Sequence, residues 1–283
     1  MRLPSVSCLR HNAGGLAGMG LLALLVLAAM AAPLLPLPDP LRIDLHACAV
    51  PPLSPGHLLG TDQLGRDILA RLVAGSRITL LMALAAVTLG GVGGMSLGIL
   101  AGYAGGITDR IIMRMVDMQL AMPLMLLALM VVAVLGPGLR NLVLVLALTS
   151  WVRYARVIRG QVRVLRRGDL VLAARAIGLG PAGIMFHHVL PCVRAPALVV
   201  GTLELARVVV IEAALSFLGL GVQPPWPSWG RMLAEGRLYI VNAWWIVTFP
   251  GLAIMATILA INLTGDWLRD RLDPRGEAYH GAA

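Results

Sequence analysis

Lysine is absent from this chain of 283 residues, and all 23 of its basic residues are arginine. The absence excludes a phosphate-binding P-loop lysine, a Schiff-base lysine and a lysine general base. Any ATP that the protein uses must therefore be hydrolysed by another polypeptide. Cysteine is scarce too, and Cys8, Cys48 and Cys192 are too few and too scattered for a disulfide framework.

Charge is also scarce, because only 13% of the residues are Asp, Glu, Lys or Arg, about half the level usual in soluble proteins. Hydrophobic residues make up 58% of the chain, fall in long blocks and raise the mean hydropathy to +0.84. The low polarity is not typical of a disordered chain, and the 32 glycines show no collagen-like period. The net charge of +9 is explained first by membrane topology rather than by nucleic-acid binding. Composition therefore favours an all-α integral membrane protein with no nucleic-acid partner.

Six segments are apolar enough to cross a bilayer, which takes about 20 residues in a helix. The first is interpreted as an uncleaved helix, because its apolar run is longer than that of a signal peptide and Pro33 follows Ala31 and Ala32, where cleavage would occur. The predicted spans are 13–35, 78–103, 118–135, 142–157, 195–218 and 246–267.

The arginines are unevenly divided between the two sides of the membrane that six spans imply. Fifteen lie in the termini and connections on one side and seven on the other, with Arg207 inside the fifth span. The arginine-rich side is predicted to be cytoplasmic, so both termini are expected in the cytoplasm. The expected organisation is a first part, 1–75, with the cytoplasmic tip, first span and extracytoplasmic loop; a core of five spans, 76–268, with a cytoplasmic loop at 153–194; and a cytoplasmic tail, 269–283.

Four glycines, Gly90, Gly94, Gly98 and Gly102, recur every four residues in the second span. Residues four apart share one face of a helix, and glycine lets a neighbouring backbone approach closely. The spacing therefore predicts tight packing of this face against another helix. A surface on which the neighbouring helix slides is a second interpretation, compatible with the first.

The connection at 38–77 is long enough to do more than join two spans. Asp67 precedes an amphipathic run and is predicted to cap a short helix. His57, Asp62 and Asp67 could form a metal site, but turn and capping roles are commoner for Asp in a glycine-rich stretch. The sequence therefore predicts no metal site.

The connection at 153–194 is the most basic part of the chain. Its first arginines recur every three or four residues, so the fourth span is expected to continue out of the membrane as a helix with one basic face. Asp169 then opens a helix, Gly178 and Gly180 break it, Pro181 starts a second short helix and Pro191 ends that helix. The string Gly-Leu-Gly-Pro-Ala-Gly follows a helix rather than a strand, so it is not a dinucleotide fingerprint.

This helix–glycine–helix unit resembles the EAA loop of binding-protein-dependent ABC importer permeases. The family pattern is Glu-Ala-Ala, three residues, Gly, nine residues, then Ile-x-Leu-Pro. Leu172 stands where Glu is usual, and His188 stands where Ile is usual. The residues that match at the family spacing are Ala173, Ala174, Gly178, Leu190 and Pro191.

Three further strings narrow the resemblance to the C-type permease subunit of the dipeptide, oligopeptide and nickel group. They lie at 57–67, 212–233 and 249–274, and the resemblance covers about residues 16–275. It implies a six-helix permease of type I, or MetI-like, architecture in the bacterial inner membrane. The implied partners are a second related permease, two ATPase subunits that use ATP and Mg, and an extracytoplasmic substrate-binding protein. No cofactor is expected on this chain.

The resemblance also implies a role for the basic loop. Residues 179–188 are expected to lie in a groove of the ATPase as a coupling helix, with Gly178 and Gly180 permitting the break before it. The alternative is a loop folded only against its own protein. We expect Gly178→Asp to uncouple transport while the protein remains in the membrane.

The fifth span contains three ionisable residues, Glu204, Arg207 and Glu212. Each mid-membrane charge costs about 2.5–3.5 kcal/mol on insertion scales, so such residues are functional candidates. Glu204 and Arg207 are three residues apart and can pair on one helix face. One interpretation is that this face lines a water-filled substrate path between two permeases. The alternative is an internal ion pair, or a Glu212 near enough to the outer end of the span to be solvated.

The sequence favours a substrate conduit over an enzyme, because it contains no nucleophile–base pair and no HExxH motif. Within the resembling group, di- or oligopeptide is the expected substrate and nickel, or another metal chelate, is the alternative. An ion-coupled secondary transporter is a remote alternative, because only the fifth span carries Glu and no inverted repeat is evident.

Overall fold

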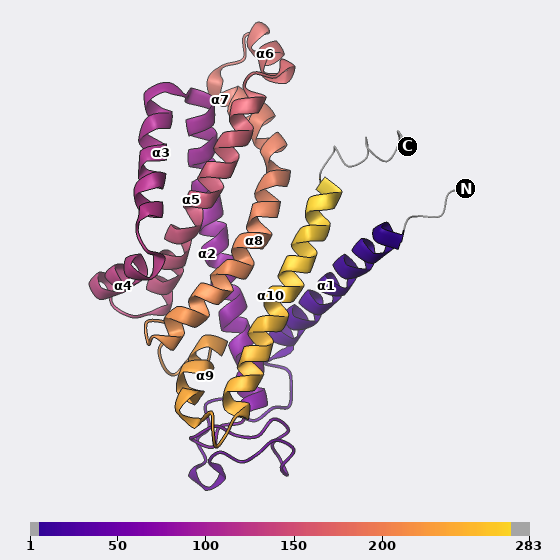
Figure 1. Cartoon of the computed structure of the whole chain (residues 1–283), viewed down its shortest axis with the longest axis vertical. Helices are drawn as coiled ribbons and strands as arrows, with labels where there is room; N and C mark the ends of the chain where they lie inside the picture. Colours follow the sequence, from indigo (N-terminus) through magenta and orange to yellow (C-terminus); the bar gives the residue numbers. More distant parts are fainter. Residues whose placement is uncertain (1–5, 273–283) are drawn as a thin grey trace.

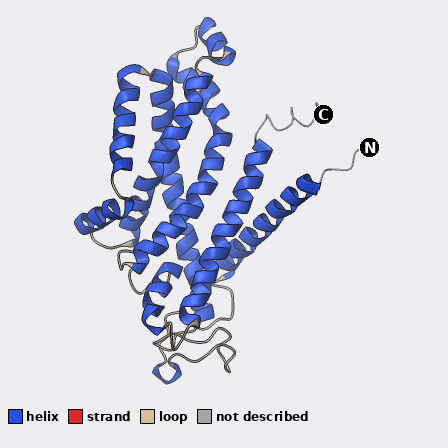
Figure 2. Ribbon diagram, in the orientation of Figure 1, coloured by secondary structure: helices blue, strands red, loops and turns tan. Residues whose placement is uncertain are grey.

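The computed structural model describes residues 6–272, with side chains described from residue 13 onward. Figure 2 shows that this part of the chain consists of helices and loops, with no strand. The expected all-α class is therefore confirmed for the described residues. The N-terminal tip before residue 6 and the predicted tail beyond residue 272 lie outside the description.

The helices differ widely in length, and a short π-helical turn, Met185–Val189, joins α7 to α8 without a break. Two 3-10 turns, Leu45–Ala47 and Arg237–Tyr239, lie in the connections. In chain order the α-helices are α1 (Val6–Ala31), α2 (Ile68–Ala104), α3 (Gly106–Ala121), α4 (Leu124–Leu135), α5 (Leu139–Leu165), α6 (Asp169–Ala176), α7 (Pro181–Ile184), α8 (Leu190–Phe217), α9 (Trp229–Gly236) and α10 (Trp245–Leu272).

The bundle is built on α2 and α5, with α8 beside both (Figure 1). On one flank α10 packs on α8 and α1 packs on α10, while α3 and α4 lie on the other flank. The turns of α6 and α7 form one end of the molecule, here called the hairpin end. The opposite end carries α9 and the loop 38–67 and is called the α9 end. The start of α1 and the finish of α10 both point toward the hairpin end.

The expected number of six spans is not confirmed. Four helical segments are long and apolar enough to cross a membrane, and a fifth qualifies if α3 and α4 count as one bent span. α8 is 28 residues long, but Glu204, Arg207 and Glu212 leave it too charged to qualify on composition. The segments that qualify singly are Ala13–Ala31, Ile68–Ala104, Leu139–Leu165 and Trp245–Leu272.

The predicted third span, 118–135, is wrong as a straight helix. The chain breaks at Met122 and Pro123, and the helices before and after the break meet at 96°. Proline lacks the N–H that would continue the helix and forces the preceding residue out of the helical region. Met122 is accordingly extended, with φ −86° and ψ 132°. Most of the predicted span is therefore α4; only its first four residues belong to α3, which begins twelve residues earlier than expected.

Two other boundaries differ from the prediction. Asp67 does cap a helix, accepting the backbone N–H of Ala70 at 2.8 Å, but this helix is the 37-residue α2 itself. Pro191 does not end a helix, because it lies in the first turn of α8, where its missing N–H is tolerated. The fourth helix does continue past the apolar segment, as predicted, and ends at Leu165.

The glycine face of α2 lies against α5. A Cβ atom added at Gly90, Gly98 or Gly102 would come within 2.7, 2.8 and 2.7 Å of atoms of α5, and one at Gly94 would overlap the carbonyl oxygen of Trp151. Real Cβ atoms essentially never approach so closely. The four glycines therefore let the two central backbones pack in direct contact.

Candidate functional site

The first candidate site is the α6–α7 hairpin, residues 169–189. At the end of α6, Gly178 adopts the left-handed conformation with φ +85°. The N–H of Gly178 donates to the carbonyl of Arg175 at 3.0 Å, and the N–H of Leu179 donates to that of Ala174 at 3.1 Å. This pair of bonds is a Schellman motif, which favours glycine at the left-handed position. Pro181 then starts α7 at a position that needs no N–H donor.

One face of the hairpin is packed on the bundle and the other is exposed. Val171, Ala174 and Ile184 are buried in a cluster with residues of α2, α5 and α8. On the opposite face, Ile177 is 78% exposed and Phe186 is 66% exposed. Among the sequence-predicted coupling residues, Ala174 is buried, Leu190 is half-buried, and the others are exposed: Ala173, Gly178, Gly180 and Pro191.

A basic cavity of about 580 Å³ lies beside the hairpin, between the α2–α3 turn, the end of α5 and α6. Arg166 and Arg175 also lie over the ring of Tyr103, at 6.0 and 5.4 Å from its centre. Arginine stacks on aromatic rings in this way while its N–H groups stay available. The charged residues that line the cavity are Asp109, Arg163, Arg166, Arg167 and Arg175.

The second candidate site is centred on Glu204, at the middle of α8, where the carboxylate is buried with 1% of the residue exposed. Arg207, one turn further along α8, donates from Nη2 to Glu204 Oε2 at 2.6 Å and to the carbonyl of Thr149 at 3.1 Å. The predicted pairing of Glu204 with Arg207 is therefore present in the structure. The carboxylate has a second cation as well, because Arg153 Nε lies 3.3 Å from Glu204 Oε1.

Arg153 is a residue that sequence reasoning placed differently. The sequence places it among the arginines of a basic helix face that continues out of the membrane. In the structure it turns to Glu204 on α8, and its side chain stays 56% exposed. Only the packing of α5 beside α8 brings the two residues together, and no local pattern in the sequence indicates it.

A cavity of about 390 Å³ opens beside Glu204, between the end of α3, α5 and α8. Arg156 reaches the same cavity, but its guanidinium is paired with Asp117 of α3, with 2.6 Å between Nη2 and Oδ1. Most of the wall is apolar. The lining residues are Leu120, Val152, Arg153, Arg156, Val157, Val200, Leu203 and Glu204.

Glu212 does not belong to this site. It lies eight residues beyond Glu204 on α8, about 12 Å along the axis, and it is fully enclosed near the α9 end. Its Oε1 accepts the hydroxyls of Ser216 at 2.8 Å and of Ser228 at 3.0 Å. These bonds hold the connection after α8 against the helix, so the role of Glu212 is structural.

The α9 end contains a closed set of ion pairs, here called the α9 network. Asp62 accepts Arg66 Nε at 2.7 Å and also pairs with Arg71. Glu235 of α9 pairs with Arg66, Arg71 and Arg231 at 2.7, 2.8 and 2.7 Å. The network therefore fastens the loop before α2 to α9, with every carboxylate held by arginine.

The network also sets the charge state of Glu235. Burial raises the pKa of this carboxyl, but Arg71, Arg66 and Arg231 together outweigh burial and hold the pKa below its usual value of 4.5. His57 Nδ1 lies 2.9 Å from Asp67 Oδ2 nearby. No group of three or more metal-ligating side chains is found among the described residues, and here Asp62 faces arginines rather than His57.

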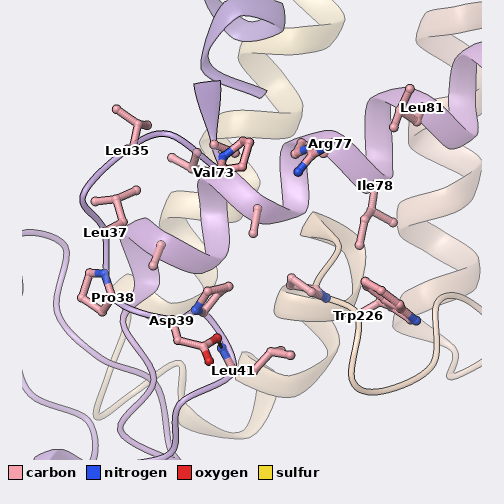
Figure 3. A pocket seen from close by; sticks show the side chains of 16 residues that line it. Leu35, Leu37, Pro38, Asp39, Leu41, Val73, Arg77, Ile78, Leu81 and Trp226 are labelled. Carbon is pink, nitrogen blue, oxygen red and sulfur yellow. Dashed lines mark hydrogen bonds between the residues drawn. The ribbon is translucent and has the colours of Figure 1, made fainter. Parts of the chain in front are cut away.

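An apolar cavity of about 520 Å³ lies between the connection after α1, the first turns of α2 and Trp226. Figure 3 shows Leu35, Leu37 and Pro38 on the side of the connection, facing Val73 of α2. Among the residues lining it, only Asp39 and Arg77 are charged, and Asp39 accepts the backbone N–H of Leu41 at 2.9 Å. This cavity at the α9 end therefore has mostly apolar walls.

The fold is an all-helical bundle over the described residues, with a hairpin projecting from one end. Among solved structures, the chain is similar to a chain of the MetNI methionine ABC transporter in an inward-facing conformation, with a TM-score of 0.58 and 22% identity. The match covers 71% of this chain and 96% of that one. At this identity the likeness shows the fold alone.

Sequence comparison gives the family. Residues 94–277 match the family of inner membrane components of binding-protein-dependent transport systems, and this chain belongs to it. It is 46% identical over 270 residues to a di/tripeptide transport system permease protein, DppC, of Pseudomonas aeruginosa, covering 94% of this chain and 89% of that one. A glutathione transport system permease, GsiD, of Pectobacterium atrosepticum is 42% identical, with 94% and 88% covered. The Haemophilus influenzae dipeptide permease DppC is 39% identical, with 94% and 92% covered. The chain is therefore a membrane transport component rather than an enzyme.

Proposed function

We propose that this chain is the permease subunit of an ATP-driven importer of di- or oligopeptides and forms the translocation path with a second, related permease. The observation that carries the proposal is the 46% identity, over 94% of the chain, to a permease named for di- and tripeptides. The relatives named for dipeptides and glutathione add to it, because glutathione is itself a short peptide. They favour peptide over nickel, and the family match gives no support to an ion-coupled transporter.

The energy comes from partner subunits. The proposed complex contains two ATPase subunits, which use ATP and Mg, and an extracytoplasmic binding protein that delivers the substrate. This chain contributes no lysine for phosphate binding and needs no cofactor of its own. Membership of a binding-protein-dependent family supports the presence of both kinds of partner.

The α6–α7 hairpin is the proposed contact with the ATPase. Ile177 and Phe186 expose large apolar side chains on its outward face, while Val171 and Ala174 anchor the other face to the bundle. An exposed apolar face on a firmly packed element suits a surface that another protein covers. In this proposal the hairpin end is cytoplasmic and both termini are cytoplasmic too, which is supported by the start of α1 and the finish of α10 pointing toward the hairpin end.

The proposed path runs past the Glu204 site. Glu204 and Arg207 meet there at the middle of α8, and a cavity opens beside Glu204. Ionisable residues inside an apolar helix are functional candidates by default. Glu212, the third residue expected on the path, is bonded to serines near the α9 end and is not proposed to line it.

The test is transport by the assembled complex in proteoliposomes, with the ATPases, second permease and binding protein that its own organism encodes. We expect ATP-dependent uptake of labelled dialanine and no uptake of labelled Ni²⁺. Uptake of Ni²⁺ without uptake of dialanine would contradict the proposal. Dialanine uptake by this chain alone, driven by an ion gradient, would contradict it as well.

A further inference from the structure

The charges at the Glu204 site do not balance. One carboxylate lies between two guanidiniums, those of Arg207 and Arg153. The neighbouring Arg156 is neutralised by Asp117 and adds no further charge. The site therefore carries one positive charge more than its carboxylate can offset, and the excess is on the exposed partner, Arg153.

The excess charge lies at the wall of a cavity between helices of the bundle. Arg153 lies 14 residues after the first residue of α5 and 12 before the last; Glu204 lies 14 and 13 residues from the ends of α8. At 1.5 Å per residue the site is about 20 Å from either end of both helices. Because its Nε faces Glu204, the Arg153 guanidinium turns toward the cavity between α3, α5 and α8 rather than along α5 toward the head groups.

Arg153 has hydrogen-bonding capacity to spare. Only its Nε faces Glu204, and within the described residues neither terminal nitrogen of the guanidinium has an acceptor. These nitrogens form a planar fork that matches the two oxygens of a carboxylate. Arg207 has no such freedom, because its Nη2 is already held by Glu204 and by the carbonyl of Thr149.

The cavity beside Arg153 has the remaining features of a site for a short peptide. Its volume is about 390 Å³, and Leu120, Val200 and Leu203 give it apolar walls. We propose that Arg153, held in place by Glu204, binds the terminal carboxylate of the peptide during its passage. This assignment rests on the proposed function and names the chemical group that the path recognises.

The experiment compares variants of the assembled complex in ATP-driven uptake of dialanine. Arg153→Gln is expected to lower the maximal uptake rate about tenfold, the scale of one charged hydrogen bond. The KM should stay unchanged, since the binding protein sets it. Arg153→Lys should retain most of the rate. Arg140→Gln is the control, because Arg140 is an exposed arginine on the same helix and lies outside the cavity, and it should transport at the normal rate.

A second variant separates charge from folding. Arg153→Cys is placed in a chain whose three native cysteines are replaced by serine, and the complex is treated with methanethiosulfonate reagents of either charge. The positively charged reagent should restore uptake, and the negatively charged one should not. Dialanine should also slow the reaction of the cysteine with either reagent.

Three results would overturn the assignment. They are normal uptake by Arg153→Gln, equal rescue by both reagents, and loss of complex assembly in Arg153→Gln, which would identify Arg153 as a contact with the second permease. If the unmodified complex takes up no dialanine, the proposed function fails and the assignment fails with it. Normal dialanine uptake by both the unmodified complex and Arg153→Gln would contradict the role of Arg153 and leave the proposed function standing.

Discussion

The α9 network and the hairpin end differ in how far their side chains find partners within the chain. At the α9 end, Asp62 and Arg71 are 1% and 3% exposed, and each is paired within the chain. At the hairpin end, Ile177 and Phe186 are mostly exposed, and several arginines line an open cavity. The charges of the α9 network are paired within the chain, whereas the hairpin end has apolar and basic surface that a partner can cover. Substitutions in the α9 network should alter the stability of the fold, and substitutions at the hairpin end should alter the coupling of ATP hydrolysis to transport.

The largest expected effect is on the α9 network. Arg71→Ala removes one charged hydrogen bond from Asp62 and one from Glu235, each of which contributes about 1.5–3 kcal/mol to the free energy of unfolding. Arg77→Ala, on the same helix but exposed, is the control and should be close to neutral. Denaturant unfolding of the purified chain in detergent measures both. Equal stability of the two variants would show that the α9 end does not depend on its ion pairs.

The next effect concerns the contact between α2 and α5, which joins the two ends. Gly94→Ala places a methyl group on the carbonyl of Trp151 and should cost about 1–3 kcal/mol, as overpacking does. Gly93→Ala, one residue earlier, meets nothing within 4 Å and should be neutral or slightly stabilising. Thermal unfolding in detergent distinguishes them. If both variants melt alike, the glycine face is not a close packing surface.

At the hairpin end the expected change is in coupling. Gly178→Val forces a β-branched residue into a left-handed conformation, which costs about 1–2 kcal/mol of conformational energy. The substitution should therefore distort the hairpin and leave the rest of the bundle unchanged. Uptake and substrate-stimulated ATPase activity of the complex should fall, with the unfolding midpoint of the chain little changed. Gly180→Ala has ordinary backbone angles and open space around it, so it should retain both activities. Normal transport by Gly178→Val would separate the hairpin from coupling.

The smallest expected effect depends on pH. Glu235 has a pKa held below 4.5 by its arginines, so its carboxylate stabilises the fold above that pH. This stabilisation is lost as the pH falls through the folded-state pKa. The melting temperature of the wild type should therefore drop more between pH 5 and lower values than that of Glu235→Gln. Parallel pH profiles would mean that Glu235 contributes nothing to the stability of the network.

Local rules account for the parts that the sequence predicts well. The glycine and proline at 178 and 181 bound the hairpin because one favours a left-handed turn and the other a helix start. Asp67 caps α2 for an equally local reason. Pro123 lies in the predicted third span, but the 96° bend also depends on how α3 and α4 each pack on α5.

Ion pairs between segments that are distant in the sequence could not be predicted from the sequence. Arg66 and Glu235 are 169 positions apart, and Arg153 and Glu204 lie on different helices. Either arginine looks like an ordinary flanking charge when only its neighbours in the chain are considered. Their partners follow from the packing of α2 against α9 and of α5 against α8, which one sequence does not specify.

The central claim is that the hairpin end is completed by an ATPase subunit. The most direct measurement is the labelling rate of Phe186→Cys with a fluorescent maleimide, in a chain whose native cysteines are replaced by serine. We predict rapid labelling of the chain alone and at least tenfold slower labelling in the complex with the ATPases, because an interface-buried thiol requires opening before reaction. A cysteine at Thr61, buried at the α9 end, should label slowly in both. Equal labelling of position 186 with and without the ATPases would contradict the claim.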